Sequence, residues 1–281
     1  MRPTARRARP IVHFQFPWKL VPLLAVLIVV LLGPALMPSP TAQSLADRLQ
    51  PPLAMGGERL GTDGLGRDLL ARIVVGAGTS LQISFITATG AAILGIVAGV
   101  LAGMIGGWVD RIITLLVETV LAVPFITVGL MVTATMGQST LSLALLLIGT
   151  GWITHARVLR SQAQVTSHAD FVRASHAMGA GRAHVARHHM LPNLYPVATV
   201  VYFQQVGSML LWSASLTWLG IGLPMERISL GRIVRDGQEL LYNGWWVSVA
   251  GGLAIVIIVT SLNLAADWLR AELDPTRRGH A

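Results

Sequence analysis

Three histidines have the spacing that best suits metal chemistry. His184 and His188 lie four residues apart, so they share one face of a helix, and His189 is adjacent. A zinc-protease helix would also need the glutamate of an H-E-x-x-H pattern, and no carboxylate accompanies these histidines. The chain has no Cys, which excludes disulfides, thiolate metal sites and cysteine nucleophiles. We therefore predict no metal ligand and no catalytic residue, and a membrane-embedded metalloenzyme is the least favoured function.

Nucleotide chemistry is restricted by the scarcity of lysine. A P-loop of the form G-x-x-x-x-G-K-[ST] needs a lysine to hold the phosphates. The only lysine is Lys19, which lies beside a long apolar run. We therefore expect that the chain is not an enzyme and binds no cofactor. Any energy for an active process must come from a partner or from a gradient.

The composition is that of a membrane protein. Of 281 residues, 53% are hydrophobic and only 12% are charged, which argues against a soluble enzyme and against a disordered chain. Six segments approach or exceed the roughly 20 apolar residues that a helix needs to cross a bilayer. They are residues 20–37, 80–105, 112–134, 140–156, 196–222 and 246–268. Helices satisfy their own backbone in lipid, so we predict an all-α integral membrane protein with six spans.

The first span, 20–37, follows an Arg-rich start and has a short apolar core, as a secretory signal peptide does. No convincing A-x-A cleavage site follows it, and five further spans come after it. We therefore expect an uncleaved first helix.

The charge distribution predicts the orientation in the membrane. With six spans, both termini share one side with the loops 107–111 and 157–195. That side carries fourteen basic and six acidic residues, a net charge of +8, whereas the other side carries seven of each. The positive-inside rule places the first side in the cytoplasm. This topology accounts for the high pI, and nucleic-acid binding is an unnecessary hypothesis.

These spans and loops define the expected organisation of the chain. It comprises a cytoplasmic tail (1–19), a first transmembrane helix (20–37), an extracytoplasmic segment (38–79), a five-helix core (80–268) with a cytoplasmic loop (157–195), and a cytoplasmic tail (269–281).

Small residues recur in the second span. Gly95, Gly99, Gly103 and Gly107 follow one another at intervals of four, which makes a flat stripe on one helix face. Close backbone approach drives helix association in lipid, where hydrophobic burial offers little. We predict a helix–helix seam there, within the chain or with a partner.

Polar residues at membrane depth are few: Gln82, Gln204, Gln205, Ser208 and Asn263. The last four are candidates for a water-filled translocation pathway, with the adjacent pair Gln204–Gln205 the best, because two neighbouring amides are costly unless solvated or paired. Interhelical hydrogen bonding is the alternative for each.

The loop before the fifth span has the pattern of a helical turn on a glycine. Phe171, Ala174, Ser175 and Met178 share one helical face, and Gly179 suits a left-handed helix end. A second short helix is expected over 182–189, stopped by Pro192. We expect a helix–glycine–helix elbow that docks on a partner, because so short a helix is marginal alone.

This loop resembles the EAA loop of ABC-importer permease subunits, which runs E-A-A-x-x-x-G and ends in an I-L-P-like triplet. The matching stretches are Arg173-Ala174-Ser175, Gly179 and Met190-Leu191-Pro192. Arg173 stands where the family usually has Glu, and Ser175 replaces the second Ala. The charge reversal puts the usual polar contact of the loop in doubt, but not the elbow.

Three further stretches resemble the C-type permease subunit of dipeptide, oligopeptide and nickel importers. They are G-T-D-G-L-G-R-D within 61–72, S-L-T-W-L-G-I-G at 215–222, and N-L-A-A-D-W-L-R-A-E-L-D-P at 263–275, where Ala266 replaces a usual Gly. The ordered set covers roughly residues 20–275.

The resemblance implies a type I importer permease in the plasma or inner membrane, and it implies several partners. These are a homologous permease, two cytoplasmic ATPase subunits that bind ATP and magnesium, and an extracytoplasmic binding protein that delivers the substrate. Peptide is the expected cargo, with nickel or another small solute as the alternative. A stand-alone secondary transporter is less favoured, because no internal repeat and no deep acidic site are visible. The resemblance assigns ATPase coupling to Asp170, Phe171, Val172, Arg173, Ala174, Ser175, Met178, Gly179, Leu191 and Pro192.

Overall fold

The computed structural model describes residues 18–53 and 60–273. Within these ranges the chain is helical, with no β-strand and one isolated bridge between Thr62 and Asp68. The predicted all-α class is therefore confirmed. Most of the two predicted tails, residues 1–17 and 274–281, lies outside the described residues.

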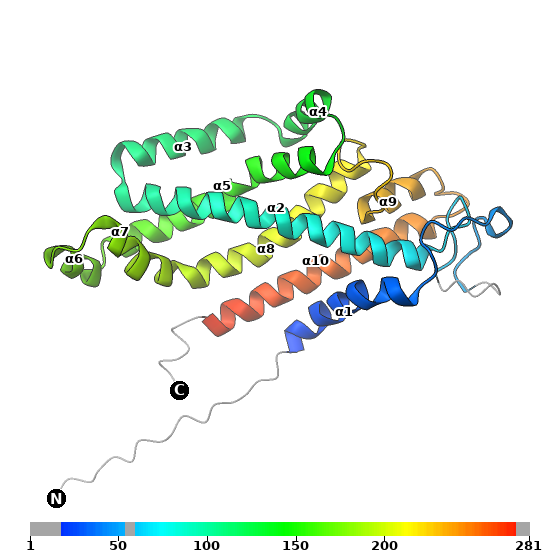
Figure 1. Ribbon diagram of the computed structural model, residues 1–281, viewed down its shortest axis with the longest axis horizontal. Helices are drawn as coiled ribbons and strands as arrows, with labels where there is room; N and C mark the ends of the chain where they lie inside the picture. The colour runs from blue at the N-terminus through cyan, green and yellow to red at the C-terminus, as the bar shows by residue number, and fades with distance from the viewer. Residues whose placement is uncertain (1–17, 54–59, 274–281) are drawn as a thin grey trace, which may run out of the picture.

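The long helices lie side by side along the molecule (Figure 1). The short α6 and α7 lie at one end, which we call the elbow end, and α9 and the segment before α2 lie at the other, the loop end. The helices are α1 (Val21–Leu36), α2 (Leu69–Ile105), α3 (Gly107–Ala122), α4 (Phe125–Met136), α5 (Thr140–Ser167), α6 (Asp170–Ala177), α7 (Arg182–Val185), α8 (Leu191–Trp218), α9 (Leu230–Gln238) and α10 (Trp246–Leu273).

Five helical stretches are long and apolar enough to cross a membrane, in agreement with five of the predicted spans. The sixth, predicted as one helix over 112–134, is wrong in that form. It is broken into α3 and α4, which meet at 84°. Pro124 explains the break, because it lacks an N–H and forces the preceding residue out of the helical region. Val123 is accordingly extended, with φ −98° and ψ 128°.

The second span begins earlier than expected, at Leu69 rather than at residue 80. The Asp68 side chain accepts a hydrogen bond from the Ala71 N–H at 2.7 Å and so caps α2. The predicted extracytoplasmic segment 38–79 therefore ends in helix. With 37 residues, α2 is about 55 Å long, well over the roughly 30 Å of bilayer hydrocarbon.

The glycine stripe of α2 packs against α5 of the same chain. A Cβ at Gly95 would lie 2.3 Å from the Trp152 carbonyl oxygen, and one at Gly99 2.7 Å from the Ala156 oxygen. At Gly103 the Ala163 Cβ would be 2.5 Å away. Only glycine permits this approach. The prediction was wrong for Gly107, which begins α3 with φ +58° after a tight turn and has no atom within 4 Å of its Cβ position.

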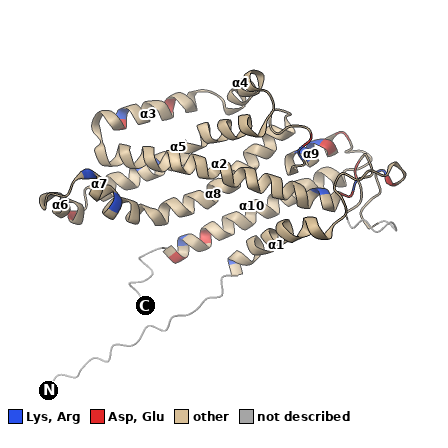
Figure 2. Ribbon diagram, viewed as in Figure 1, with Lys and Arg blue, Asp and Glu red and all other residues tan. Residues whose placement is uncertain are grey.

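Charged residues concentrate towards the two ends of the long helices, which are almost free of them along their middles (Figure 2). Ion pairs are therefore expected at the two ends, whereas the middle of the long helices offers apolar packing and a few uncharged polar groups.

Candidate functional site

The elbow turns on Gly179. Its φ of +87° is a left-handed conformation that L side chains rarely adopt, and no atom lies within 4 Å of its Cβ position. The Met178 N–H donates to the Ala174 carbonyl at 3.0 Å and the Ala180 N–H to that of Ser175 at 3.1 Å, which close the end of α6. Backbone conformation alone, rather than crowding, therefore requires glycine here.

The two faces of α6 have different surroundings. Val172 and Ser175 are buried, and Val172 packs in a small apolar cluster with Leu159, Val185 and Met190 from α5, α7 and the turn before α8. Phe171 is 46% exposed and Met178 82% exposed. The predicted apolar face is thus corrected: Ser175 points inward, while Phe171, Ala174 and Met178 point outward.

Pro192 does not stop the second elbow helix, contrary to the prediction. From Arg182 to Trp218 the chain is one helical stretch, with a π-helical turn at Ala186–Met190 between α7 and α8. The Leu191 N–H bonds to the Ala186 carbonyl five residues back, and Pro192 follows in the first turn of α8. Proline is tolerated at a helix start because its missing N–H is not needed there. The elbow is therefore continuous with α8.

Polar residues of α8 face a cavity of about 490 Å³ in the middle of the molecule. The cavity lies between α8, α5 and the broken pair α3–α4, and Gln204, Gln205 and Ser208 line it. Gln205 is nonetheless buried, and its Nε2 donates to the Gly151 carbonyl at 2.7 Å, so it also holds α8 on α5. Asn263 lies apart on α10, exposed, and does not line this cavity.

His155 was missed as a polar residue at membrane depth. It is fully buried on α5, one turn beyond Gly151, and lies beside the Gln205 side chain. Neither imidazole nitrogen nor Gln205 Oε1 has a hydrogen-bond partner among the described residues. Polar groups therefore lie not only on the cavity wall but also behind it, where His155 of α5 meets Gln205 of α8 and Gly95 of α2. No motif signalled this residue.

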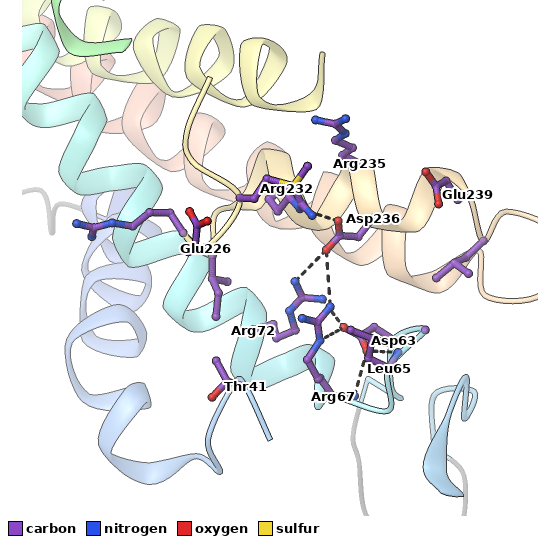
Figure 3. A pocket seen from close by; sticks show the side chains of 15 residues that line it. Thr41, Asp63, Leu65, Arg67, Arg72, Glu226, Arg232, Arg235, Asp236 and Glu239 are labelled. Atoms are coloured by element: carbon purple, nitrogen blue, oxygen red, sulfur yellow. Dashed lines mark hydrogen bonds and ion pairs between the residues drawn. The ribbon is translucent and has the colours of Figure 1, made fainter. Parts of the chain in front are cut away.

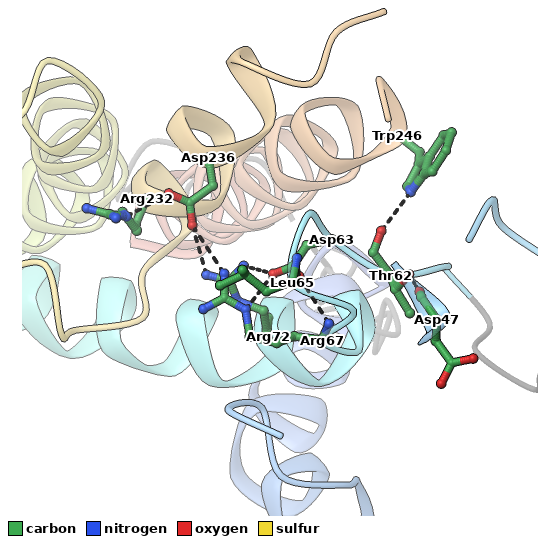
Figure 4. A network of polar contacts seen from close by, with 9 residues as sticks. All are labelled: Asp47, Thr62, Asp63, Leu65, Arg67, Arg72, Arg232, Asp236 and Trp246. Carbon is green, nitrogen blue, oxygen red and sulfur yellow. Dashed lines mark hydrogen bonds and ion pairs between the residues drawn. The ribbon is translucent and has the colours of Figure 1, made fainter. Parts of the chain in front are cut away.

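At the loop end a buried ion network joins α2 to α9, and the sequence reasoning missed it (Figure 4). Asp63 and Arg72 side chains are each 2% exposed and pair directly. Arg72 Nη2 lies 3.0 Å from Asp236 Oδ2, and Arg232 Nε lies 2.7 Å from Asp236 Oδ1. Arg67 Nε pairs with Asp63 Oδ2 at 2.7 Å. The G-T-D-G-L-G-R-D stretch was the available signal, because it supplies Asp63 and Arg67.

The pKa of Asp63 lies below its ordinary value. Burial by itself raises this pKa, but backbone N–H groups of Arg67 and Leu65 and the charge of Arg72 lower it by more. Asp63 Oδ1 accepts those N–H bonds at 3.0 and 2.8 Å. The two backbone N–H groups and the two arginines, Arg67 and Arg72, therefore stabilise the charged form of the Asp63 carboxylate.

A pocket of about 490 Å³ opens beside this network, lined by residues before α2 and on α9 (Figure 3). Asp236, Arg67 and Arg72 point toward one another at its base, while Glu239 and Arg235 lie apart from them. The charged groups at its base are already paired with one another, as Arg67, Arg72 and Arg232 share the two aspartates Asp63 and Asp236.

Three histidines of the elbow contact one another through their rings. The His184 and His188 rings stack with centroids 4.2 Å apart, and His189 meets His184 edge-on. No group of three or more His, Asp or Glu side chains in residues 18–53 and 60–273 is arranged to hold a metal ion.

Comparisons with known proteins agree with this architecture. The family described as binding-protein-dependent transport system inner membrane component matches residues 95–279. A protein of Brucella abortus, named as a peptide transport system permease protein, is 35% identical over 97% of this chain and 90% of its own. The dipeptide transport system permease protein of Alkalihalophilus pseudofirmus is 30% identical over 91% of this chain and 84% of its own.

A solved structure has the same fold. A chain of the MetNI methionine ABC transporter, in an inward-facing conformation, aligns with a TM-score of 0.62 over 72% of this chain and 96% of its own. At 20% identity the likeness concerns the fold alone. The family match and the similar relatives carry the assignment: the chain belongs to the binding-protein-dependent inner membrane components, the multi-pass permease subunits of ABC importers.

Proposed function

We propose that this permease imports peptides and forms half of their pathway, facing a homologous permease. An extracytoplasmic binding protein delivers the peptide, and two cytoplasmic ATPase subunits bind ATP and magnesium, so this chain takes no cofactor. The relatives are named for peptide and dipeptide transport, which favours peptide over nickel as the cargo. One observation of the structure supports the division of labour above the others: the exposed elbow is packed onto a helix that walls the cavity.

The elbow is connected to the cavity by packing. Val172 on α6 lies in one cluster with Leu159 of α5 and Met190 before α8, and all three are buried. A displacement of α6 must therefore move α5 and α8, because close-packed interiors transmit strain. Those two helices carry two of the cavity's walls, with Gln204 and Ser208 among their lining residues. An ATPase that pulls on the exposed Phe171 and Met178 would thus change the shape of the cavity.

The cavity suits a pathway for varied peptides. Residues of α3 and α4 form one of its walls, and no charged side chain lines it. Uncharged amides and a hydroxyl can hydrogen-bond a peptide backbone without holding one side chain. We assign selection of the cargo to the binding protein, and passage to this surface.

In this proposal the elbow and both termini lie in the cytoplasm. The basic excess on that side supports this orientation through the positive-inside rule. A single Cys placed at Met178 reports the side directly, because the chain has no other thiol. Labelling of Met178→Cys by an impermeant maleimide added outside intact cells would reverse the assignment.

The full complex tests the function. Purified permeases and ATPases in liposomes, with binding protein on one side, should accumulate labelled dipeptides and longer peptides only with ATP. Gly179→Val should abolish uptake while ATP hydrolysis continues, because the turn at φ +87° disfavours a β-branched residue. Gly252→Ala is the matched control, since its Cβ would meet nothing within 4 Å. Peptide movement by this chain without ATPases would instead establish a secondary transporter.

A further inference from the structure

A second cavity, of about 260 Å³, lies between α3 and α5. Leu121 lines both this cavity and the central one that Gln204 and Ser208 line, so the two are neighbours. The second cavity is lined by earlier residues of α3, within 113–118, and by later residues of α5, within 156–160. Because α3 begins and α5 ends at the elbow end (Figure 1), it lies on the elbow side of the central cavity, and we call it the inner cavity.

The lining changes from uncharged to charged between the two cavities. No charged side chain of the described residues lines the central cavity, whereas Glu118, Arg157 and Arg160 line the inner one. Arg160 is already occupied, because its Nη2 lies 2.7 Å from Asp110 Oδ2 and its Nε also pairs with that carboxylate. Glu118 and Arg157 are exposed, and neither forms an ion pair with any residue in the described ranges. Two opposite charges thus border one cavity without neutralising each other.

The position of Glu118 argues against contact with lipid. It lies on α3, in a segment whose composition predicts a membrane span. Charged groups at membrane depth face the protein interior or a water-filled cavity, and they mark the paths of ions and substrates. Val117, the one buried residue of α3, lines the inner cavity together with Glu118. The carboxylate therefore borders an aqueous space between α3 and α5.

A short peptide with free ends presents the complementary charges. At neutral pH it carries an ammonium group at one end and a carboxylate at the other. A guanidinium binds a carboxylate through paired N–H bonds, and a carboxylate side chain accepts hydrogen bonds from an ammonium group. Two residues of extended chain span at most about 7 Å, so both ends of a dipeptide can reach opposite walls of one small cavity. The two ends of a longer peptide are further apart.

We propose that Glu118 and Arg157 form a subsite of the pathway that binds the two termini of a dipeptide. Glu118 accepts hydrogen bonds from the ammonium group, and Arg157 donates to the carboxylate. The Asp110–Arg160 pair ties α3 to α5 beside the subsite. Charged termini lose water in the uncharged central cavity, which is costly, and the subsite offsets this cost on the way out. The inference rests on the proposed function and adds a preference for short zwitterionic peptides after the binding protein.

Initial uptake by the full complex in liposomes, with saturating binding protein, measures the subsite. Glu118→Gln and Arg157→Gln should each lower the uptake of a dipeptide about tenfold, because each removes one charge-assisted contact. Glu272→Gln and Arg111→Gln are matched controls, since both are exposed charges outside the inner cavity, and they should keep the wild-type rate. Unchanged uptake in both subsite variants would overturn the subsite, whereas a wild-type complex that moves no peptide would overturn the proposed function itself.

A charge exchange separates binding from a structural role. Glu118→Arg makes the inner cavity wholly basic and should abolish dipeptide uptake. Glu118→Arg/Arg157→Glu restores one charge of each sign, so it should recover uptake with the peptide reversed. All these variants should keep the wild-type Tm, because neither side chain has an ion pair to lose among the described residues. A Tm that falls in parallel with uptake, or a double variant as inactive as the single one, would contradict the proposal.

A photoreactive dipeptide locates the ligand without the binding protein. A dipeptide that contains benzoylphenylalanine, added to the purified complex of permeases and ATPases, should form adducts within residues 113–121 or 153–160. Excess unlabelled dipeptide should prevent these adducts, and the same dipeptide with acetylated and amidated ends should not. Glu118→Gln should reduce the adducts about tenfold. Adducts that arise only elsewhere in the complex, or equal protection by the capped dipeptide, would refute the subsite.

Discussion

The loop end and the elbow have similar residue types but differ in how their charged residues are paired and buried. Each combines arginines, aspartates and glycines in left-handed turns. At the loop end Asp63 and Arg72 are buried against each other, whereas Arg173 at the elbow is 71% exposed and paired only in solvent. The comparison shows that an arginine supports the fold where the chain itself supplies its partner. Where its only partner is an exposed neighbour, as for Arg173, it contributes little to the stability of the fold.

The glycines differ in the same way. At Gly66 a Cβ would lie 1.8 Å from the Ser44 carbonyl oxygen, and at Gly61 it would lie 2.4 Å from that of Gln50. Both are crowded and have positive φ, which locks the segment before α2 onto its neighbours. Gly179 has the positive φ but open space around it. The loop end is a fixed anchor, whereas at the elbow the turn at Gly179 is set by backbone conformation and not by crowding.

Breaking the anchor should have the largest effect. Arg72→Met keeps the length of the side chain but leaves Asp63 buried with one partner fewer. Removing one member of a buried pair costs about 3–5 kcal/mol. We expect a marked drop in Tm, followed in detergent by the fluorescence of the eight tryptophans.

The double variant Asp63→Leu/Arg72→Met tests the reason for that loss. Replacing both charges leaves neither member of the buried Asp63–Arg72 pair without its partner, so the double variant should lose less stability than Arg72→Met alone. A double variant that is less stable than the single one would show that the pair matters for something other than mutual neutralisation.

The second prediction applies the comparison to glycines within α2 and α5. Gly95→Ala places a methyl group 2.3 Å from the Trp152 carbonyl oxygen, so α2 and α5 must separate. Overpacking of this kind costs about 1–3 kcal/mol. Gly149→Ala on α5 meets nothing within 4 Å and should keep the wild-type Tm or raise it slightly. Equal effects at both positions would contradict the placement of the seam.

The anchor should also respond to acid. The folded pKa of Asp63 is depressed, so its contribution to stability is complete above the unfolded pKa of about 3.9 and is lost as pH falls through the folded value. Wild-type Tm should therefore fall below about pH 4 more steeply than that of Asp63→Asn. Parallel curves for the two proteins would remove Asp63 from this role.

The sequence was sufficient for features that depend on local pattern. Apolar length predicted five spans correctly, and Gly179 was predicted to end a helix because glycine adopts the left-handed region without steric cost. Sequence reasoning failed where contacts with other helices determine the local structure. Hydropathy does not record the break at Pro124. The helical spacing grouped Ser175 with Phe171, Ala174 and Met178, and it cannot show that Ser175 alone of these four is buried in the folded chain.

Long-range pairing was out of reach for the same reason. Asp63 and Asp236 are 173 residues apart, and only the folded chain brings both to Arg72. Of the candidate pathway residues, Gln204, Gln205 and Ser208 meet at one cavity because they share a face of α8, whereas Asn263 belongs to another helix. Periodicity groups residues within an element, but not between elements.

The smallest effect should come from repeating the anchor substitution at the elbow. Arg173→Met makes the same chemical change as Arg72→Met, on a side chain whose only partner is an exposed Asp170. Exposed substitutions of this kind shift stability by about 0.5 kcal/mol or less, so the Tm should match that of the wild type. Under the proposed function, ATPase retention should nevertheless decrease, because α6 belongs to the elbow assigned to ATPase coupling. A Tm loss close to that of Arg72→Met would mean that the chain itself uses Arg173, and the contrast between the two ends would not hold.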